Sequence, residues 1–220
     1  MFNGAGNVIK YSLWVREYMI NEAHEQAVSN LARCVNVDAR LPDRVFTEGY
    51  ADVYVMDFLN LFHWTAVELC KALMQQEGSS IVALGRFDRP KKETEDWRDD
   101  VFSVSPSTKG DDYMTFQTRN WVEFAQQRAT PDMREPWRVF AERIGACSNL
   151  GTWCIYGELT AEIAMLGSNI RLTPEVEKRL HSEFGIQRLV DALKRDTFCG
   201  EPGNEHSKRW RAILRSAYLP

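Results

Sequence analysis

The amino-acid sequence predicts a single α+β domain, in which several helices pack on a small mixed or antiparallel sheet. Two kinds of periodicity support this class, because apolar residues alternate in some segments and recur every three or four residues in others. The predicted strands and helices follow one another in mixed order, whereas a parallel α/β sheet needs regular alternation. The length of 220 residues, with 44% hydrophobic residues, suffices for one core over residues 1–220.

The first fifty residues predict a strand, a helix and a turn. Apolar residues alternate from Val8 to Val15 as in a half-buried strand, although a seven-residue repeat through the same stretch leaves a helix as the alternative. Asn21 is a suitable cap for the helix that follows, and the Leu-Pro-Asp turn at 41–43 should end it. The inner face of this helix would consist of Ala23, Ala27, Leu31 and Cys34.

A strand, a helix and a second strand are predicted between residues 50 and 84. Residues 50–56 are rich in β-favouring side chains, and the helix should begin at Asp57 and end at Gly78, a residue suited to a left-handed terminus. Residues 81–84 form a wholly apolar run, which is typical of a strand covered on both faces. The apolar stripe of the helix would be Leu59, Phe62, Ala66, Leu69 and Leu73.

The middle of the chain predicts a long loop followed by further elements. Residues 88–112 are polar and are interrupted by prolines and glycine, so we expect a surface loop. Residues 113–116 resume a strand-like pattern, and a helix should begin near Trp121. A second helix should run over residues 136–144, with a proline in its first turn.

The last third predicts a hairpin and then a helical segment over about 173–220. Residues 152–166 contain two β-favouring runs around a turn at 157–160, which indicates a hairpin. Thr173 and Pro174 provide the cap and first turn of a helix, and Gly185 is a point at which that helix could divide in two. A final short helix would pack through Trp210, Ile213, Leu214 and Ala217.

Charge and cysteine content restrict the partners and the compartment. The 27 basic and 31 acidic residues give a net charge of −4, which disfavours binding to nucleic acid or to an anionic membrane. The charge is uneven, since residues 171–220 carry a net +3. The five cysteines match no disulfide framework, and we expect reduced thiols in a cytoplasmic protein. No stretch is apolar enough for a secretion signal or a membrane helix.

Local motifs for chemistry are few. Phosphate-binding glycine loops do not occur, and the four histidines lie too far apart for a zinc motif, so we expect no metal and no cofactor. Two pairs could carry catalysis if the fold brought them together: Cys154 with His181, and Glu158 with Glu162. For Cys154, packing in the core is the competing interpretation. The basic cluster around Trp210 is interpreted as the solvated face of a helix.

One segment has the composition of a protein-binding surface. Residues 91–112 contain four basic and seven acidic residues and one tryptophan. An aromatic anchor supplies buried area at an interface, while negative charge steers a basic partner toward it. The alternative is a solvated loop whose tryptophan folds back on the core. The predicted partner-binding residues are Asp96, Trp97, Asp99, Asp100, Asp111 and Asp112.

A short stretch of the chain resembles a known class of proteins. The segment Trp153-Cys154-Ile155-Tyr156-Gly157-Glu158, continued by residues 162–166, is similar to the tryptophan-containing hairpin of bacterial immunity proteins that neutralise polymorphic toxins. The resemblance covers about 15 of 220 residues and implies a non-enzymatic cytoplasmic protein that binds a basic toxin domain. Two alternatives stay open: a small cytosolic enzyme with catalytic residues from separated loops, and a subunit of a larger assembly.

Overall fold

The computed structural model describes residues 22, 24–62, 64–79, 81–87, 97–104, 142–195, 198–200 and 203–219. The strand predicted at 8–15, the strand at 113–116 and the helix near Trp121 lie outside these ranges.

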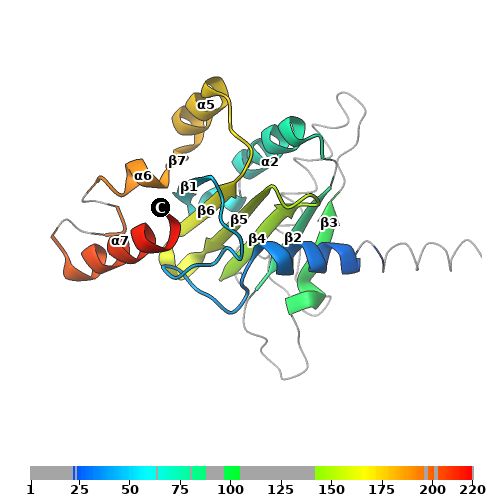
Figure 1. The fold of residues 1–220 in the computed structure, drawn as a ribbon, viewed down its shortest axis with the longest axis horizontal. Helices are drawn as coiled ribbons and strands as arrows, with labels where there is room; N and C mark the ends of the chain where they lie inside the picture. Colours follow the sequence, from blue (N-terminus) through cyan, green and yellow to red (C-terminus); the bar gives the residue numbers. More distant parts are fainter. Residues whose placement is uncertain are drawn as a thin grey trace, which may run out of the picture.

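The described residues form one seven-stranded antiparallel sheet with helices on both faces, which confirms the predicted α+β class (Figure 1). Its strand order is β3-β2-β4-β5-β6-β1-β7, and every neighbouring pair is antiparallel. The strands are β1 (Asp52–Asp57), β2 (Val82–Arg86), β3 (Val101–Val104), β4 (Arg143–Ser148), β5 (Trp153–Glu158), β6 (Ile163–Ser168) and β7 (Gln187–Arg188).

The central strands are buried on both faces, because the side chains alternate between two separate apolar layers. One layer lies under α2 (Trp64–Glu77) and α5 (Pro174–Phe184), where Trp153, Ile155 and Leu166 meet Leu73 and Leu180. The opposite layer lies under helical residues 24–34, α6 (Leu189–Ala192) and α7 (Glu205–Tyr218). In Figure 1 the sheet runs between these two sets of helices.

Several helix boundaries follow from the predicted capping residues. Thr173 Oγ1 accepts the Val176 N–H at 3.4 Å, and Pro174 occupies the first turn of α5. Gly185 ends α5 in the left-handed conformation at φ 66°, and β7 and α6 follow it. Gly78 lies directly after α2 at φ 74°, as expected. The structure describes three of the four residues predicted for the inner face of the first helix. These residues, Ala27, Leu31 and Cys34, are all buried.

The hairpin predicted over 152–166 is confirmed, with small shifts at its ends. Strands β5 and β6 pair from Trp153 with Ser168 to Glu158 with Ile163. The connection is the 3-10 helix η3 (Leu159–Ala161), closed by Glu162. None of the helices that the structure describes combines the length and the apolar character that a bilayer crossing requires.

Three expectations from the sequence are wrong. Residues 97–104 are not loop, because they form the 3-10 helix η2 (Trp97–Asp100) and strand β3, which pairs with β2. Ile144 does not belong to a helix, because it lies in β4 and pairs with Gly157. The helix predicted from Asp57 begins as the 3-10 helix η1 (Phe58–Phe62), and this geometry leaves Leu59 56% exposed.

Candidate functional site

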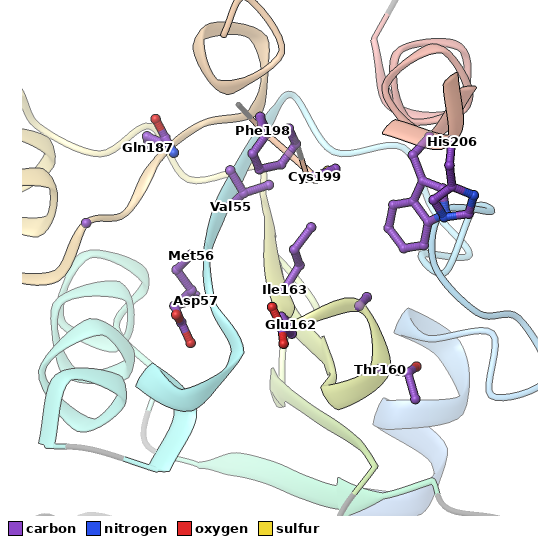
Figure 2. A pocket seen from close by; sticks show the side chains of 14 residues that line it. Val55, Met56, Asp57, Thr160, Glu162, Ile163, Gln187, Phe198, Cys199 and His206 are labelled. Atoms are coloured by element: carbon purple, nitrogen blue, oxygen red, sulfur yellow. The ribbon is translucent and has the colours of Figure 1, made fainter. Parts of the chain in front are cut away.

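A cavity of about 420 Å³ lies at one end of the sheet, between β1, the β5–β6 connection and the N-terminal half of α7. Figure 2 shows Asp57 and Glu162 on the strand side of the cavity and His206 on the facing helix. The lining brings together residues as far apart in the chain as Val55 and Trp210. Its chemically functional side chains include Asp57, Glu162, Gln187, Cys199, His206 and Trp210.

Two exposed carboxylates occupy the strand side of the cavity. Asp57 ends β1 opposite Ile163, and Glu162 directly precedes that residue in the chain. The backbone fixes both positions, because the Phe58 N–H donates to the Glu162 carbonyl at 3.1 Å. No lysine or arginine among the described residues forms an ion pair with either carboxylate. The strand side therefore carries negative charge that the described structure does not neutralise.

Glu162 adopts a backbone conformation that a glutamate rarely takes. Its φ of 56° lies in the left-handed region, where the Cβ approaches the backbone carbonyl and costs about 1 kcal/mol. The turn requires this conformation, because the Glu162 N–H donates to the Leu159 carbonyl and closes η3. Glycine would satisfy the turn at lower cost. Strained non-glycine residues of this kind cluster at functional sites.

The facing wall of the cavity is aromatic. His206 and Trp210 lie one turn apart on α7, with ring centroids 6.3 Å apart. Three contacts position this helix: Asn204 Oδ1 accepts the His206 N–H at 2.8 Å, Arg211 donates to the Phe198 carbonyl at 3.0 Å, and the Tyr218 hydroxyl donates to the Asp43 carbonyl at 2.7 Å. Arg211 is thus a structural residue, and the basic cluster on α7 is only partly a solvated face.

The remaining polar groups of the lining are an amide, a thiol and a hydroxyl. Gln187 Oε1 is buried without a hydrogen-bond partner among the described residues. Burial raises the pKa of Cys199 to about 12, so its thiol stays protonated at neutral pH. The Thr160 hydroxyl donates to Glu158 Oε1 at 3.0 Å and is already satisfied. A group that donates hydrogen bonds and carries positive charge complements this lining.

Exposed leucines lie next to the carboxylates. η1 and η3 are in contact at this end of the sheet. Leu59 on η1 is 56% exposed and Leu159 on η3 is 37% exposed. These two leucines add exposed apolar surface beside the charged cavity.

The structure places only part of the predicted acidic segment. Trp97 is half-buried, and its ring meets the edge of Phe87 with centroids 5.5 Å apart. The Arg98 guanidinium lies 5.7 Å from the Trp97 ring centroid. Asp99 and Asp100 belong to η2, whereas Asp96, Asp111 and Asp112 lie outside the described residues. Trp97 therefore contacts the core with part of its ring, as in the alternative interpretation of this segment.

The two pairs considered for catalysis do not come together. Cys154 is fully buried in the layer under residues 24–34, whereas His181 is exposed on α5, across the sheet. Glu158 is also buried and accepts four hydrogen bonds, while Glu162 is exposed at the cavity. Neither arrangement gives a nucleophile or an acid beside a matching base.

Three of the cysteines form a buried cluster. Hydrogen bonds from the Cys147 and Cys154 thiols lower the pKa of Cys34. The hydrogen bond to Cys34 and burial raise the pKa of Cys147, and burial raises that of Cys154. All three side chains have no solvent exposure. The cluster is therefore closed to reagents in the folded state, whichever thiol ionises first.

Thiol titration tests this arrangement. With a dithiobis-nitrobenzoate reagent at neutral pH, we expect no fast-reacting thiol in the native protein. Cys34, Cys70, Cys147 and Cys154 should react only at the rate of unfolding, because they are buried. Cys199 is half-buried and should react slowly. All five should react at once in denaturant, and one fast native thiol would contradict the described packing.

Sequence reasoning did not find the cavity. The sequence predicts the start of a helix at Asp57, and it places Trp210 in a basic cluster that is predicted to be solvated. Only the predicted turn near Glu158 marked the region that also contains Glu162. Comparisons of this chain with protein-family models, with curated proteins and with solved structures find no match.

Proposed function

We propose that this chain is a non-enzymatic protein that binds a specific protein partner, and that the cavity receives a lysine or arginine side chain of that partner. One observation carries the proposal: Asp57 and Glu162, with no ion-pair partner among the described residues, face the aromatic residues of α7 across the cavity. A guanidinium there could pair with the carboxylates and stack on Trp210.

The surroundings of the cavity support a protein partner. Leu59 and Leu159 would supply apolar contact area beside the charged pocket. A basic anchor in a pocket, with apolar side chains that exclude water around it, is the usual arrangement of an interface hot spot. The overall charge of −4 would steer a basic protein toward this surface.

More specifically, we propose an immunity protein that neutralises a bacterial toxin. The support is the likeness of the Trp153–Leu166 hairpin to that of such proteins, because the turn of this hairpin contributes Thr160, Ala161 and Glu162 to the cavity. The separation of Cys154 from His181 also favours a binder over an enzyme. The acidic segment with Asp96, Trp97, Asp99, Asp100, Asp111 and Asp112 is proposed as a further contact for the same basic partner.

The test uses paired variants that remove charge without harming the fold. Glu162→Gly removes a carboxylate at φ 56° and should leave the free energy of unfolding unchanged or raise it by up to about 1 kcal/mol. Asp57→Asn is isosteric. The wild type should capture the partner from lysate of the source cells at about 0.05 M salt. The double variant should capture none of it, or at least about tenfold less.

Glu175→Gln is a control for each of the two single variants, since it removes one negative charge and Glu175 is exposed on α5, which covers the other face of the sheet. It should leave capture unchanged. Equal capture by the wild type and by Asp57→Asn/Glu162→Gly would overturn the cavity as the binding site. The immunity assignment has a test of its own: co-expression of the wild type should restore growth to cells that make the captured protein. A captured protein that is not toxic would contradict it.

A further inference from the structure

A second cavity, of about 440 Å³, lies on the other side of β7, between that strand, α5 and the end of α6. Its floor consists of Leu172, Leu180 and Ile186, which are all buried. Tyr54 of β1 forms part of the wall. The volume falls in the range of small-molecule sites, and an apolar floor with a few polar groups at the rim is their usual composition.

The acidic groups of this cavity are already paired. Glu177 Oε1 accepts the Tyr54 hydroxyl at 2.6 Å and two Arg188 N–H groups at 2.9 and 2.7 Å. Burial opposes the ionisation of Glu177, but these hydrogen bonds prevail and lower its pKa. Arg188 also contacts Asp52 at 3.3 Å. Asp191, at the rim, pairs with Lys194 at 2.6 Å.

The basic groups at the rim are not all paired. Lys178 on α5 and Arg195 after α6 are exposed, and neither forms an ion pair within the described residues. His181 also lines the rim, with Nδ1 3.3 Å from the Ile186 carbonyl, a separation at which this nitrogen can act as the donor. The rim thus presents two cations and one imidazole above an apolar floor. The unpaired charge of this cavity is positive, whereas that of the first cavity is negative.

We propose that the cavity between α5 and β7 binds a small organic anion with an apolar body, such as an aromatic carboxylate or sulfonate. The ring would lie on Leu172, Leu180 and Ile186, and the anionic group would lie between Lys178 and Arg195. Glu177 and Asp191 are already paired with basic side chains. Lys178 and Arg195 would therefore be the groups that select an anionic ligand over a neutral one. This inference does not depend on the proposed partner-binding function, because it concerns a different cavity with opposite charge.

Anilinonaphthalene sulfonate is a suitable probe, because its fluorescence reports transfer into an apolar site. We expect saturable binding of one molecule to the native 220-residue chain. The double variant Lys178→Gln/Arg195→Gln should raise the Kd at least about tenfold, which corresponds to about 1.4 kcal/mol. The neutral N-phenylnaphthylamine should bind wild type and variant alike. In a methyl-labelled sample, the Ile186 signal should shift on addition of the probe, whereas Ile213 on α7 should not.

The control variant, Lys208→Gln/Arg209→Gln, removes the same charge from exposed positions of α7. It should leave the Kd for the sulfonate unchanged. Equal weakening by both variants would mean a general charge effect and would overturn the site. So would probe binding that is not saturable, or an unmoved Ile186 signal. Naphthoate should displace the probe; displacement by an acidic hexapeptide at a lower concentration than naphthoate would indicate a protein-binding surface and contradict the small-ligand proposal.

Discussion

Replacement of Glu158 by alanine is expected to lower the free energy of unfolding by about 3 kcal/mol, one of the two largest effects of a single substitution that we predict. The Glu158 side chain is 3% exposed and accepts four hydrogen bonds. They come from Arg40 Nη1 at 3.1 Å, the Leu41 N–H at 3.0 Å, the Tyr156 hydroxyl at 3.1 Å and the Thr160 hydroxyl at 3.0 Å.

The cost arises from the donors that the substitution leaves behind. The Leu41 N–H is buried and would lose its acceptor, which costs about 1–3 kcal/mol, whereas the buried Tyr156 hydroxyl would keep only a longer contact, of 3.4 Å, with the Ala39 carbonyl. Burial and then the neighbouring Glu158 carboxylate raise the pKa of Tyr156, so its hydroxyl keeps its proton and remains a donor. Arg40 is 37% exposed and can turn to water, so its ion pair with Glu158 contributes little.

Urea denaturation monitored by far-UV circular dichroism measures the effect, with Arg40→Ala as the comparison. Arg40→Ala should cost less than about 1 kcal/mol, because it leaves Glu158 with three of its hydrogen bonds, including both that come from buried donors. Glu158→Gln should fall between the two. If Glu158→Ala cost no more than Arg40→Ala, the buried carboxylate would not organise this end of the sheet.

Glu158 shows where interpretation of the sequence failed. The sequence marks Glu158 and Glu162, on either side of a predicted turn, as a pair that could act together. The fold instead buries Glu158, because residues 40–41, more than a hundred positions earlier, cover it and supply two of its donors. The local sequence pattern predicts the turn, but it does not predict which residues pack on the turn. The exposure of a polar residue depends on contacts that are distant in the chain.

Elements with strong local signals were predictable. The Thr173–Pro174 start and the Gly185 end of α5 depend on capping groups adjacent in sequence, and β2 is a short apolar run. Strand β3 was missed because four residues inside a polar segment carry little periodicity. Strand β4 was missed because its Gly145 and Ala146 have low β propensity. Both strands depend on their neighbours in the sheet.

The candidate site depends on tertiary structure to a greater extent than the individual helices and strands do. Asp57, Glu162 and Trp210 are brought to one cavity only because β1 pairs with β6 and α7 packs back across that end of the sheet. No spacing in the sequence relates them. The position of Trp97 also depends on tertiary structure, because this aromatic residue of a polar segment packs against Phe87, which is itself buried.

Gly145→Ala is expected to lower the free energy of unfolding by about 3 kcal/mol. A Cβ on Gly145 would lie 2.3 Å from Phe87 Cε2 and 2.5 Å from Phe87 Cζ. The ring cannot move away freely, because it stacks on Tyr156 with centroids 6.4 Å apart and meets Trp97 on another side. The backbone is held as well, since the Phe87 N–H donates to the Arg143 carbonyl and the Arg143 guanidinium donates to the Phe87 carbonyl.

A second substitution tests whether this contact is the cause. Phe87→Leu removes the ring atoms that clash and should by itself cost about 1–2 kcal/mol for the space left behind. Combined with Gly145→Ala it should cost at least about 1 kcal/mol less than the sum of the two single variants, as urea denaturation can determine. Gly78→Ala is the matched control: its φ of 74° disfavours alanine, but nothing lies within 4 Å of the added Cβ, so the loss should stay near 1 kcal/mol. Additive costs for Gly145→Ala and Phe87→Leu would mean that strand propensity, and not the aromatic ring, requires glycine in the middle of β4.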